Sequence, residues 1–108
     1  MLGITFKENC PDVRNTKVIS VVNELKEYGC NVEVYDPWAN PEEVMHEYCL
    51  KLLEISGLPA LQLKSYDAIL LAVAHNEFKT IDLSKKKKEA IVYDLKSIWP
   101  KNMVDARL

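Results

Sequence analysis

The first 35 residues carry the pattern that most restricts the fold. Residues 1–5 and residues 32–35 are short apolar runs, each consistent with a strand. Between them, from position 18, apolar residues recur at i, i+3, i+4 and i+7, which places them on one face of a helix. Strand, helix and strand in so short a stretch form a βαβ unit, whose two strands run parallel with a right-handed crossover. The chain is therefore predicted to be an α/β domain.

The helix of this unit is predicted over residues 16–28. Asn15 or Thr16 can cap its first turn, because a short polar side chain accepts a backbone N–H there. Gly29 follows at the position where a left-handed residue commonly ends a helix. The loop of residues 6–15 thus joins the end of the first strand to the start of the helix.

The remaining segments predict a Rossmann-like, three-layer domain with a mainly parallel sheet of about five strands. Residues 68–74 are apolar throughout, which predicts a strand buried on both faces, and residues 90–93 predict a last buried strand. Weaker patterns predict an edge strand at 48–53 and short helices at 41–47, 58–64 and 76–78. Residues 1–108 are predicted to be one domain, excised from a longer protein because a strand begins almost at once.

Charge and hydropathy exclude two classes of partner. Fourteen Lys and Arg residues stand against sixteen Asp and Glu residues, a net charge of -2. Proteins that bind nucleic acid normally carry a basic face, so we expect no nucleic-acid partner. We expect no membrane partner either, because no apolar run approaches the ~20 residues that a spanning helix needs.

The three cysteines indicate a reduced, cytoplasmic protein. Cys10, Cys30 and Cys49 are odd in number and lack the paired spacing of zinc sites, so neither a disulfide framework nor a metal site is predicted. We expect Cys30 and Cys49, which flank or lie in predicted strands, to be core residues.

Three side chains follow the predicted strand ends. Lys7, His75 and Lys96 come directly after the first, the long central and the last strand. Open α/β sheets bind ligands beyond the carboxyl ends of their strands, at the point where the strand order reverses. If the first and central strands are neighbours, the three side chains converge on one crevice there. The alternative is that each simply faces solvent.

The loop after the first strand suits an anion. Lys7 and Arg14 bracket it, and the partially positive N-terminus of the following helix points the same way. The four lysines at 85–88 could suggest a second phosphate patch, but they precede a buried strand and are predicted to be a solvated connection.

Five runs of residues, taken in this order, resemble one known family. The chain is similar to the C-terminal domain of nucleotide-sugar 6-dehydrogenases, the UDP-glucose and GDP-mannose dehydrogenase family. Its sequence most resembles the branch that oxidises UDP-N-acetylhexosamines. The matching runs are residues 6–17 (FKENCPDVRNTK), 34–38 (VYDPW), 72–78 (AVAHNEF), 93–96 (YDLK) and 104–108 (VDARL).

The resemblance implies a function for a larger enzyme. Such enzymes oxidise the C6 alcohol of a UDP-sugar twice, to a carboxylate, using two NAD and a covalent cysteine intermediate, and supply precursors for polysaccharides. NAD is bound mainly by the N-terminal domain, and the catalytic cysteine lies upstream of this domain. This chain then has no catalytic residue, is inactive alone, and has as partners a UDP-sugar and the rest of a homo-oligomeric parent enzyme.

The resemblance also assigns roles to three residues. Lys7 stands at the position of the lysine that contacts the nucleotide-sugar substrate. Arg14 stands at that of the arginine that contacts NAD. Lys96 matches a basic residue that touches the substrate, although other branches have arginine there, which offers a bidentate fork in place of a point charge. Ser97 and Ala106 replace glycines of the family pattern, so strain is predicted if either position needs a positive φ.

Several residues keep two interpretations. Asp12 holds the Arg14 guanidinium or caps the loop through an Asx-turn, and the cap is favoured. Asp36 could be the ribose-binding acid of a dinucleotide fold, but no glycine-rich fingerprint precedes it and an N-cap role is favoured. His75 is a wall of the nucleotide pocket or, as we favour, a capping or packing residue. Trp38 and Trp99 either stack on a base or pack at a domain or subunit contact.

Cys10 is not expected to be a nucleophile, and His46 is expected to be a surface residue. The alternative to the dehydrogenase domain is a stand-alone regulatory module of receiver type, which shares a parallel sheet and a lysine after its last strand. Such a module needs an acceptor Asp at the end of a central strand, where this chain reads Ala-Val-Ala-His.

Overall fold

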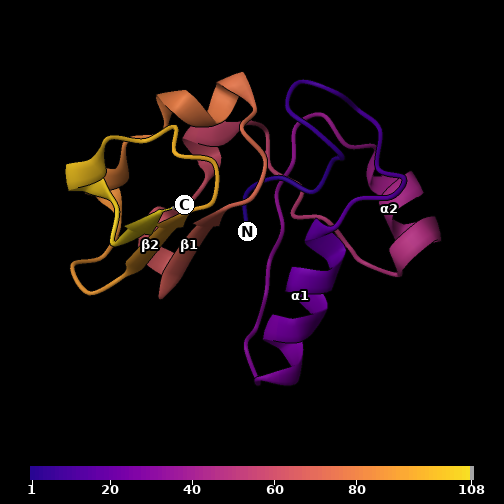
Figure 1. Cartoon of the computed structure of the whole chain (residues 1–108), viewed down its shortest axis with the longest axis horizontal. Coiled ribbons are helices and arrows are strands. Elements are labelled where there is room, and N and C mark those ends of the chain that lie inside the picture. The colour runs from indigo at the N-terminus through magenta and orange to yellow at the C-terminus, as the bar shows by residue number, and fades with distance from the viewer. Residues whose placement is uncertain (108) are drawn as a thin grey trace.

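The computed structural model describes residues 1–107 and has the α/β architecture that the sequence predicts (Figure 1). Its α-helices, α1 (Val18–Glu27) and α2 (Pro41–Tyr48), lie to the right of β1 and β2 in Figure 1, with the N-terminus between the two groups. The strands are β1 (Ala68–Leu71), β2 (Ile91–Asp94) and β3 (Ala106–Arg107). Short 3-10 turns connect them: η1 (Leu58–Ala60), η2 (Leu63–Ser65), η3 (Asn76–Thr80), η4 (Leu83–Lys85) and η5 (Lys101–Met103).

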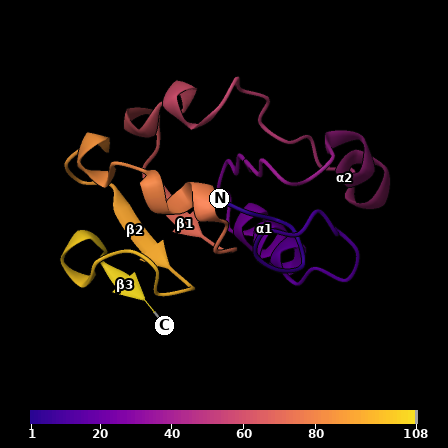
Figure 2. The same ribbon diagram turned by 90° about the horizontal axis from the view of Figure 1, so that it is seen from above.

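The sheet is parallel and has the order β1-β2-β3 (Figure 2). Ala68 pairs with Ile91 at the start of the first ladder, and Tyr93 pairs with Ala106 at the start of the second. Leu2 extends the arrangement beyond β1, because it forms parallel bridges with both Leu71 and Tyr35. The first and central segments are therefore neighbours, as supposed from the sequence. The described residues form a three-stranded sheet and not one of about five strands, because the predicted strands at residues 1–5 and 32–35 pair only by the single bridges of Leu2 and Tyr35.

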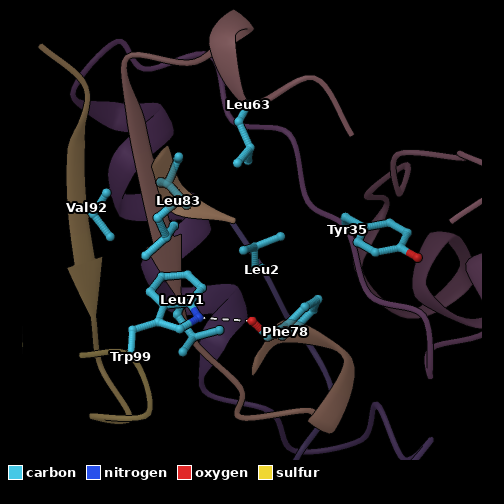
Figure 3. Packing of buried hydrophobic residues seen from close by; sticks show 9 residues of the cluster. Leu2, Tyr35, Leu63, Leu71, Phe78, Leu83, Val92 and Trp99 are labelled. Carbon is cyan, nitrogen blue, oxygen red and sulfur yellow. Dashed lines mark hydrogen bonds between the residues drawn. The ribbon is translucent and has the colours of Figure 1, made fainter. Parts of the chain in front are cut away.

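Two hydrophobic clusters pack on opposite sides of this layer. Val34 and Tyr35 are neighbours in the chain but belong to different clusters, since successive side chains of an extended segment point to opposite faces. One cluster includes Val22 of α1 and Val44 of α2. The other packs beneath the 3-10 turns, and Figure 3 shows its members, with the indole Nε1 of Trp99 donating to the carbonyl of Phe78 at 2.9 Å. Helices, sheet and turns thus form three layers.

Helix α1 begins two residues later and ends one residue earlier than the predicted range of 16–28. The N-cap residue is Lys17, whose side chain makes no capping hydrogen bond, so neither Asn15 nor Thr16 occupies the predicted cap position; the Thr16 hydroxyl, one residue earlier, accepts from the Val18 N–H at 3.2 Å. Gly29, at φ +89°, ends the helix: its N–H reaches the carbonyl of Lys26 at 3.0 Å. Helix α2 follows its prediction closely, because the Asn40 side chain accepts from the N–H groups of two of its first-turn residues.

Three strand predictions were too long or wrong. Residues 48–53 form no strand, although the Leu53 N–H donates to the carbonyl of Val34 at 2.7 Å beside the sheet. Strand β1 stops at Leu71, three residues short of the prediction, where the chain turns toward the site. Strand β2 is buried on one face only, because Ile91 is 57% exposed.

The prediction that two cysteines belong to the core was also wrong. Cys30 and Cys49 are both exposed: Cys49 directly follows α2, and Cys30 lies three residues after the end of α1. All three cysteines, Cys10 included, carry free thiols. Ser97 does take a positive φ of 57°, as its place in a glycine position predicts, whereas Ala106 lies in β3. No helix in residues 1–107 is long and apolar enough to span a lipid bilayer.

Candidate functional site

A pocket of about 230 Å³ lies where the strand order reverses, beyond the carboxyl ends of the first segment, β1 and β2. We call it the lysine pocket. Three cations from separate parts of the chain line it: Lys7 from the loop after the first segment, Lys17 at the start of α1, and Lys96 after β2. The only acid on its wall is Glu8, so its lining is basic in a chain of net charge -2. Phe6, 58% exposed, adds an aromatic surface beside Lys7.

A buried carboxylate fixes the backbone of the first segment where it reaches this pocket. Asp36 is 5% exposed, and its Oδ2 accepts from the N–H groups of Ile4 at 2.7 Å and Thr5 at 3.1 Å. Its Oδ1 accepts from the N–H groups of Trp38 at 2.8 Å and Ala39 at 3.2 Å, which confirms the predicted capping role. One side chain therefore ties the end of the first segment to the turn after residue 35.

The same carboxylate binds the imidazole of His75, which is fully buried. His75 Nε2 lies 3.0 Å from Asp36 Oδ2 and 3.1 Å from the Thr5 hydroxyl. Its Nδ1 accepts a hydrogen bond from the Asn9 N–H at 2.8 Å, so in this arrangement the ring is neutral and its proton is on Nε2. Burial pushes the pKa of Asp36 upward, but the hydrogen bonds from His75 and from the Ile4 N–H hold that pKa below its ordinary value of 3.8.

A second buried carboxylate shapes the loop that carries Lys96. Asp94 is fully buried at the end of β2. Its Oδ1 accepts from the N–H groups of Lys96 and Ser97, each at 2.8 Å, and its Oδ2 accepts from the Trp99 N–H at 2.8 Å. The loop therefore curls around the carboxylate, which fixes the backbone from which the Lys96 side chain enters the pocket.

Arg14 lies outside the lysine pocket. It lines an open depression of about 850 Å³ between the loop and α2, which we call the acidic groove. Asp12 does both things considered for it: its Oδ1 accepts from the Arg14 N–H at 2.9 Å and from the guanidinium Nε at 3.1 Å. Bonding to Asp12, with the charges of Glu43 and Glu47 nearby, raises the pKa of Arg14. The other members of the groove are Cys10, Pro11, Val13, Asn40, Glu42 and His46.

The structure thus brings together some of the residues that the sequence singled out and separates others. Lys7 and Lys96 line one pocket. His75 does not join them, because Asp36, Thr5 and Asn9 occupy both of its ring nitrogens beneath the surface. The prediction that all three converge on one crevice is wrong for His75, and the favoured packing role is confirmed.

The two tryptophans also pack within the domain. Trp99 is 3% exposed, and its indole donates to a core carbonyl. Trp38 stacks on the imidazole of His75 with ring centroids 6.0 Å apart, and its Nε1 donates to Glu77 at 3.0 Å. His46 is exposed, as predicted, and Lys87 of the basic run pairs with Asp67. Within residues 1–107, no group of three His, Cys, Asp or Glu side chains could hold a metal ion.

Sequence reasoning missed Lys17 and Asn9. Lys17 lies in the predicted helix of residues 16–28 and was assigned no role there, but a cation in the first residues of a crossover helix lies at the same sheet edge as the loop before it. Asn9 carries a weak signal, because asparagine is one of the residues that tolerate a positive φ, and here its φ is 54°. Its partner at position 75 could not be read from local sequence.

A sequence model described as the UDP binding domain of the UDP-glucose/GDP-mannose dehydrogenase family matches residues 1–101. The chain is 46% identical over 112 residues to a UDP-N-acetyl-D-glucosamine 6-dehydrogenase of Pseudomonas aeruginosa. It is 44% identical over 114 residues to the enzyme of that name from Salmonella typhi. Each alignment covers 100% of this chain and 25% of the relative, so the chain spans about a quarter of the length of these curated relatives.

The fold has a solved counterpart. The structure of a UDP-D-ManNAc dehydrogenase from Pyrococcus horikoshii superimposes with a TM-score of 0.72 over 98% of this chain and 23% of that chain. The sequence identity between the two is 22%, so this likeness concerns the fold.

Proposed function

Because the chain belongs to the UDP-glucose/GDP-mannose dehydrogenase family, as its UDP-binding domain, we propose that the lysine pocket binds the diphosphate of a UDP-N-acetylhexosamine. One observation carries the proposal: Lys7, Lys17 and Lys96 come from three separate segments and line one pocket at the point where the strand order reverses. Three ammonium groups with one nearby acid are a poor arrangement without a ligand and a good one for a diphosphate, whose charge they balance.

The size of the pocket limits how much of the ligand it holds. Pockets that enclose a whole small molecule occupy about 300–1,000 Å³, and this one occupies about 230 Å³. A diphosphate fits, with the exposed Phe6 ring beside it, whereas the sugar and the base need further walls. Those walls are proposed to come from the rest of a larger enzyme, with residues 1–108 as its nucleotide-binding domain.

For the whole enzyme we propose NAD-dependent oxidation of the sugar C6 alcohol to a carboxylate, as the names of the relatives and the sequence resemblance support. This chain binds and orients the nucleotide, and we assign no catalytic residue to it. NAD supplies the hydride acceptor. The acidic groove does not fit a whole dinucleotide, because Arg14 stands there among Asp12 and several Glu side chains. Its exposed guanidinium fits a single contact to NAD held elsewhere.

Replacing Lys7 by alanine is expected to weaken UDP binding by about 10- to 150-fold. The lost interaction is a hydrogen bond to a charged group, which contributes roughly 1.5 to 3 kcal/mol. Lys88→Ala is the matched control: Lys88 is exposed and lies before β2, at the opposite edge of the sheet from the pocket. We expect that control to change binding little, because charges beyond a Debye length of ~8 Å are screened.

The measurement is a titration of both variants and the unchanged chain with UDP, by NMR shifts, at two ionic strengths. The affinity of the unchanged chain should fall with salt, and that of Lys7→Ala should fall less. Equal losses of UDP affinity in Lys7→Ala and Lys88→Ala would contradict the proposal that the lysine pocket binds the diphosphate.

In the whole enzyme, Arg14→Ala is expected to raise the KM for NAD while leaving the dissociation constant for the UDP-sugar nearly unchanged. Arg14 lines the acidic groove, and Lys7 lines the separate lysine pocket, so the two contacts should be separable. Steady-state kinetics with NAD varied, together with equilibrium binding of the UDP-sugar, measures both quantities. If Arg14→Ala instead loses UDP-sugar affinity and keeps its KM for NAD, Arg14 contacts the UDP-sugar and not NAD.

A further inference from the structure

The loop that carries Lys7 is fastened at its middle by Asn9. The Asn9 N–H donates to His75 Nδ1 at 2.8 Å, and the Asn9 Oδ1 accepts from the Asn76 N–H at 2.9 Å. We call this pair of hydrogen bonds the Asn9 clasp. It joins residues that are 66 and 67 positions apart, so it attaches the loop to the chain beyond β1 and not to its own neighbours.

The acceptor in this clasp is held rigidly. His75 is 0% exposed, and its other ring nitrogen lies 3.0 Å from Asp36 and 3.1 Å from Thr5. The ring also stacks against Trp38 and lies 5.4 Å, between ring centroids, from Phe78. An imidazole with both nitrogens bonded and two aromatic rings packed against it cannot change rotamer without breaking these contacts.

Lys7 lies between the clasp and a second attachment. The Thr5 hydroxyl donates to the Lys7 carbonyl at 3.0 Å, and the Phe6 N–H donates to the carbonyl of Asp12 at 2.7 Å, which closes the base of the loop. The Lys7 side chain itself is exposed. The backbone of Lys7 is thus fixed from both sides, while its charge projects into the lysine pocket.

We propose that Asn9 and His75 are positioning residues for nucleotide binding: the Asn9 clasp holds the Lys7 backbone in the binding arrangement before the nucleotide arrives. The inference rests on the proposed function of the lysine pocket. A loop ordered in advance does not lose conformational entropy on binding, so the clasp contributes to affinity without touching the ligand.

The first test is Asn9→Gly in the 108-residue chain, titrated with UDP. Glycine accepts the φ of 54° and keeps the backbone N–H, so the substitution removes only the side-chain half of the clasp. UDP binding is expected to weaken about 3- to 10-fold, the equivalent of one lost hydrogen bond. The dependence of affinity on salt should stay as in the unchanged chain, because no charge is removed.

The matched control is Cys49→Gly. Cys49 is exposed, has a φ of 53° and follows α2, away from the lysine pocket, so it reproduces the extra chain entropy of a glycine at a left-handed position. UDP affinity in this control is expected to be unchanged.

The second test separates positioning by His75 from its packing. In His75→Asn, the amide oxygen can take the place of Nδ1 and accept from Asn9. In His75→Gln, the amide nitrogen can take the place of Nε2 and donate to Asp36, but the acceptor for Asn9 is lost. Both variants leave a smaller side chain in the same buried site, so urea unfolding should show similar stability losses. Only His75→Gln is expected to lose UDP affinity, by about 3- to 10-fold.

The outcomes distinguish a failure of the Asn9 clasp from a failure of the lysine pocket. If Asn9→Gly binds UDP like the unchanged chain, or if both His75 variants lose affinity equally, the clasp is structural only and the inference is overturned. In that case a large loss in Lys7→Ala would still support the lysine pocket. If the unchanged chain does not bind UDP, the proposed function itself fails.

Discussion

Substituting alanine for Asp36 is expected to lower the free energy of unfolding by about 3 to 5 kcal/mol. The buried carboxylate accepts hydrogen bonds from four backbone N–H groups and lies 3.0 Å from His75 Nε2. Removing it leaves these donors inside the protein without an acceptor, and each unsatisfied buried donor costs about 1 to 3 kcal/mol. Because small domains are stable by about 5 to 15 kcal/mol, the loss in Asp36→Ala is a large fraction of the total stability.

Urea denaturation measures the effect, with Asp82→Ala as control. Asp82 also caps a turn, accepting from the Ser84 N–H at 3.1 Å, but it is exposed, so water replaces the lost acceptor and a much smaller loss is expected. Similar losses in the two variants would show that burial of Asp36 does not matter to stability.

The pH dependence of the free energy of unfolding tests the depressed pKa of Asp36. Its pKa is lower in the folded protein than its ordinary value of 3.8, so its contribution is complete above that value and is lost as the pH falls through the folded pKa. Asp36→Asn cannot titrate, so below about pH 4 its free energy of unfolding should fall less steeply than that of the unchanged chain. Parallel curves for the two proteins in this range would contradict the depressed pKa.

Gly3→Ala is expected to cost about 2 to 5 kcal/mol, for two separate reasons. Gly3 has a φ of +96°, which costs a residue with a Cβ about 1 to 2 kcal/mol. A Cβ there would also lie 2.5 Å from the Val73 Cβ and 2.9 Å from the Val73 N, and such overpacking costs typically 1 to 3 kcal/mol. The neighbour is on a paired backbone segment, so it cannot move aside as a flexible side chain could.

Gly29→Ala separates these two reasons. Gly29 has a φ of +89°, but nothing lies within 4 Å of the position a Cβ would take, so only the conformational cost of about 1 kcal/mol is expected. The difference between the free energies of unfolding of the two variants, measured in urea, gives the cost of overpacking where the first segment lies against the chain beyond β1. Equal losses would mean that Val73 relaxes freely and that the junction is not tightly packed.

Local signals predicted the parts of the fold that depend on neighbouring residues. The apolar spacing around Val22 gave α1, and Asn40 with Pro41 gave the start of α2. The burial of two cysteines was predicted wrongly, for a physical reason. Residue type predicts burial on average, but Cys30 and Cys49 follow helix ends, where the chain turns at the surface whatever the residue.

The candidate site divides in the same way. Lys7 and Lys96 could be placed at one sheet edge from the strand pattern, because the carboxyl ends of parallel strands share an edge. The contact of His75 with Asp36 joins residues 39 positions apart, and it depends on the residue at which each extended segment ends. No periodicity or motif encodes that distance, so the sequence could not show that His75 is enclosed beneath the pocket.

The central position of Leu2 has a consequence for how the chain folds as it is made. Leu2 bridges Tyr35 on one side and Leu71 on the other, so Leu2 leaves the ribosome before both of its partners, and Leu71 follows it much later than Tyr35 does. Helix α1, whose contacts are local and which Gly29 terminates, can form early. The first segment must wait, with one edge unpaired, until β1 emerges. Contacts of such long sequence separation form slowly, and the waiting edge is where a nascent chain of this kind is open to capture by a chaperone or by another nascent chain.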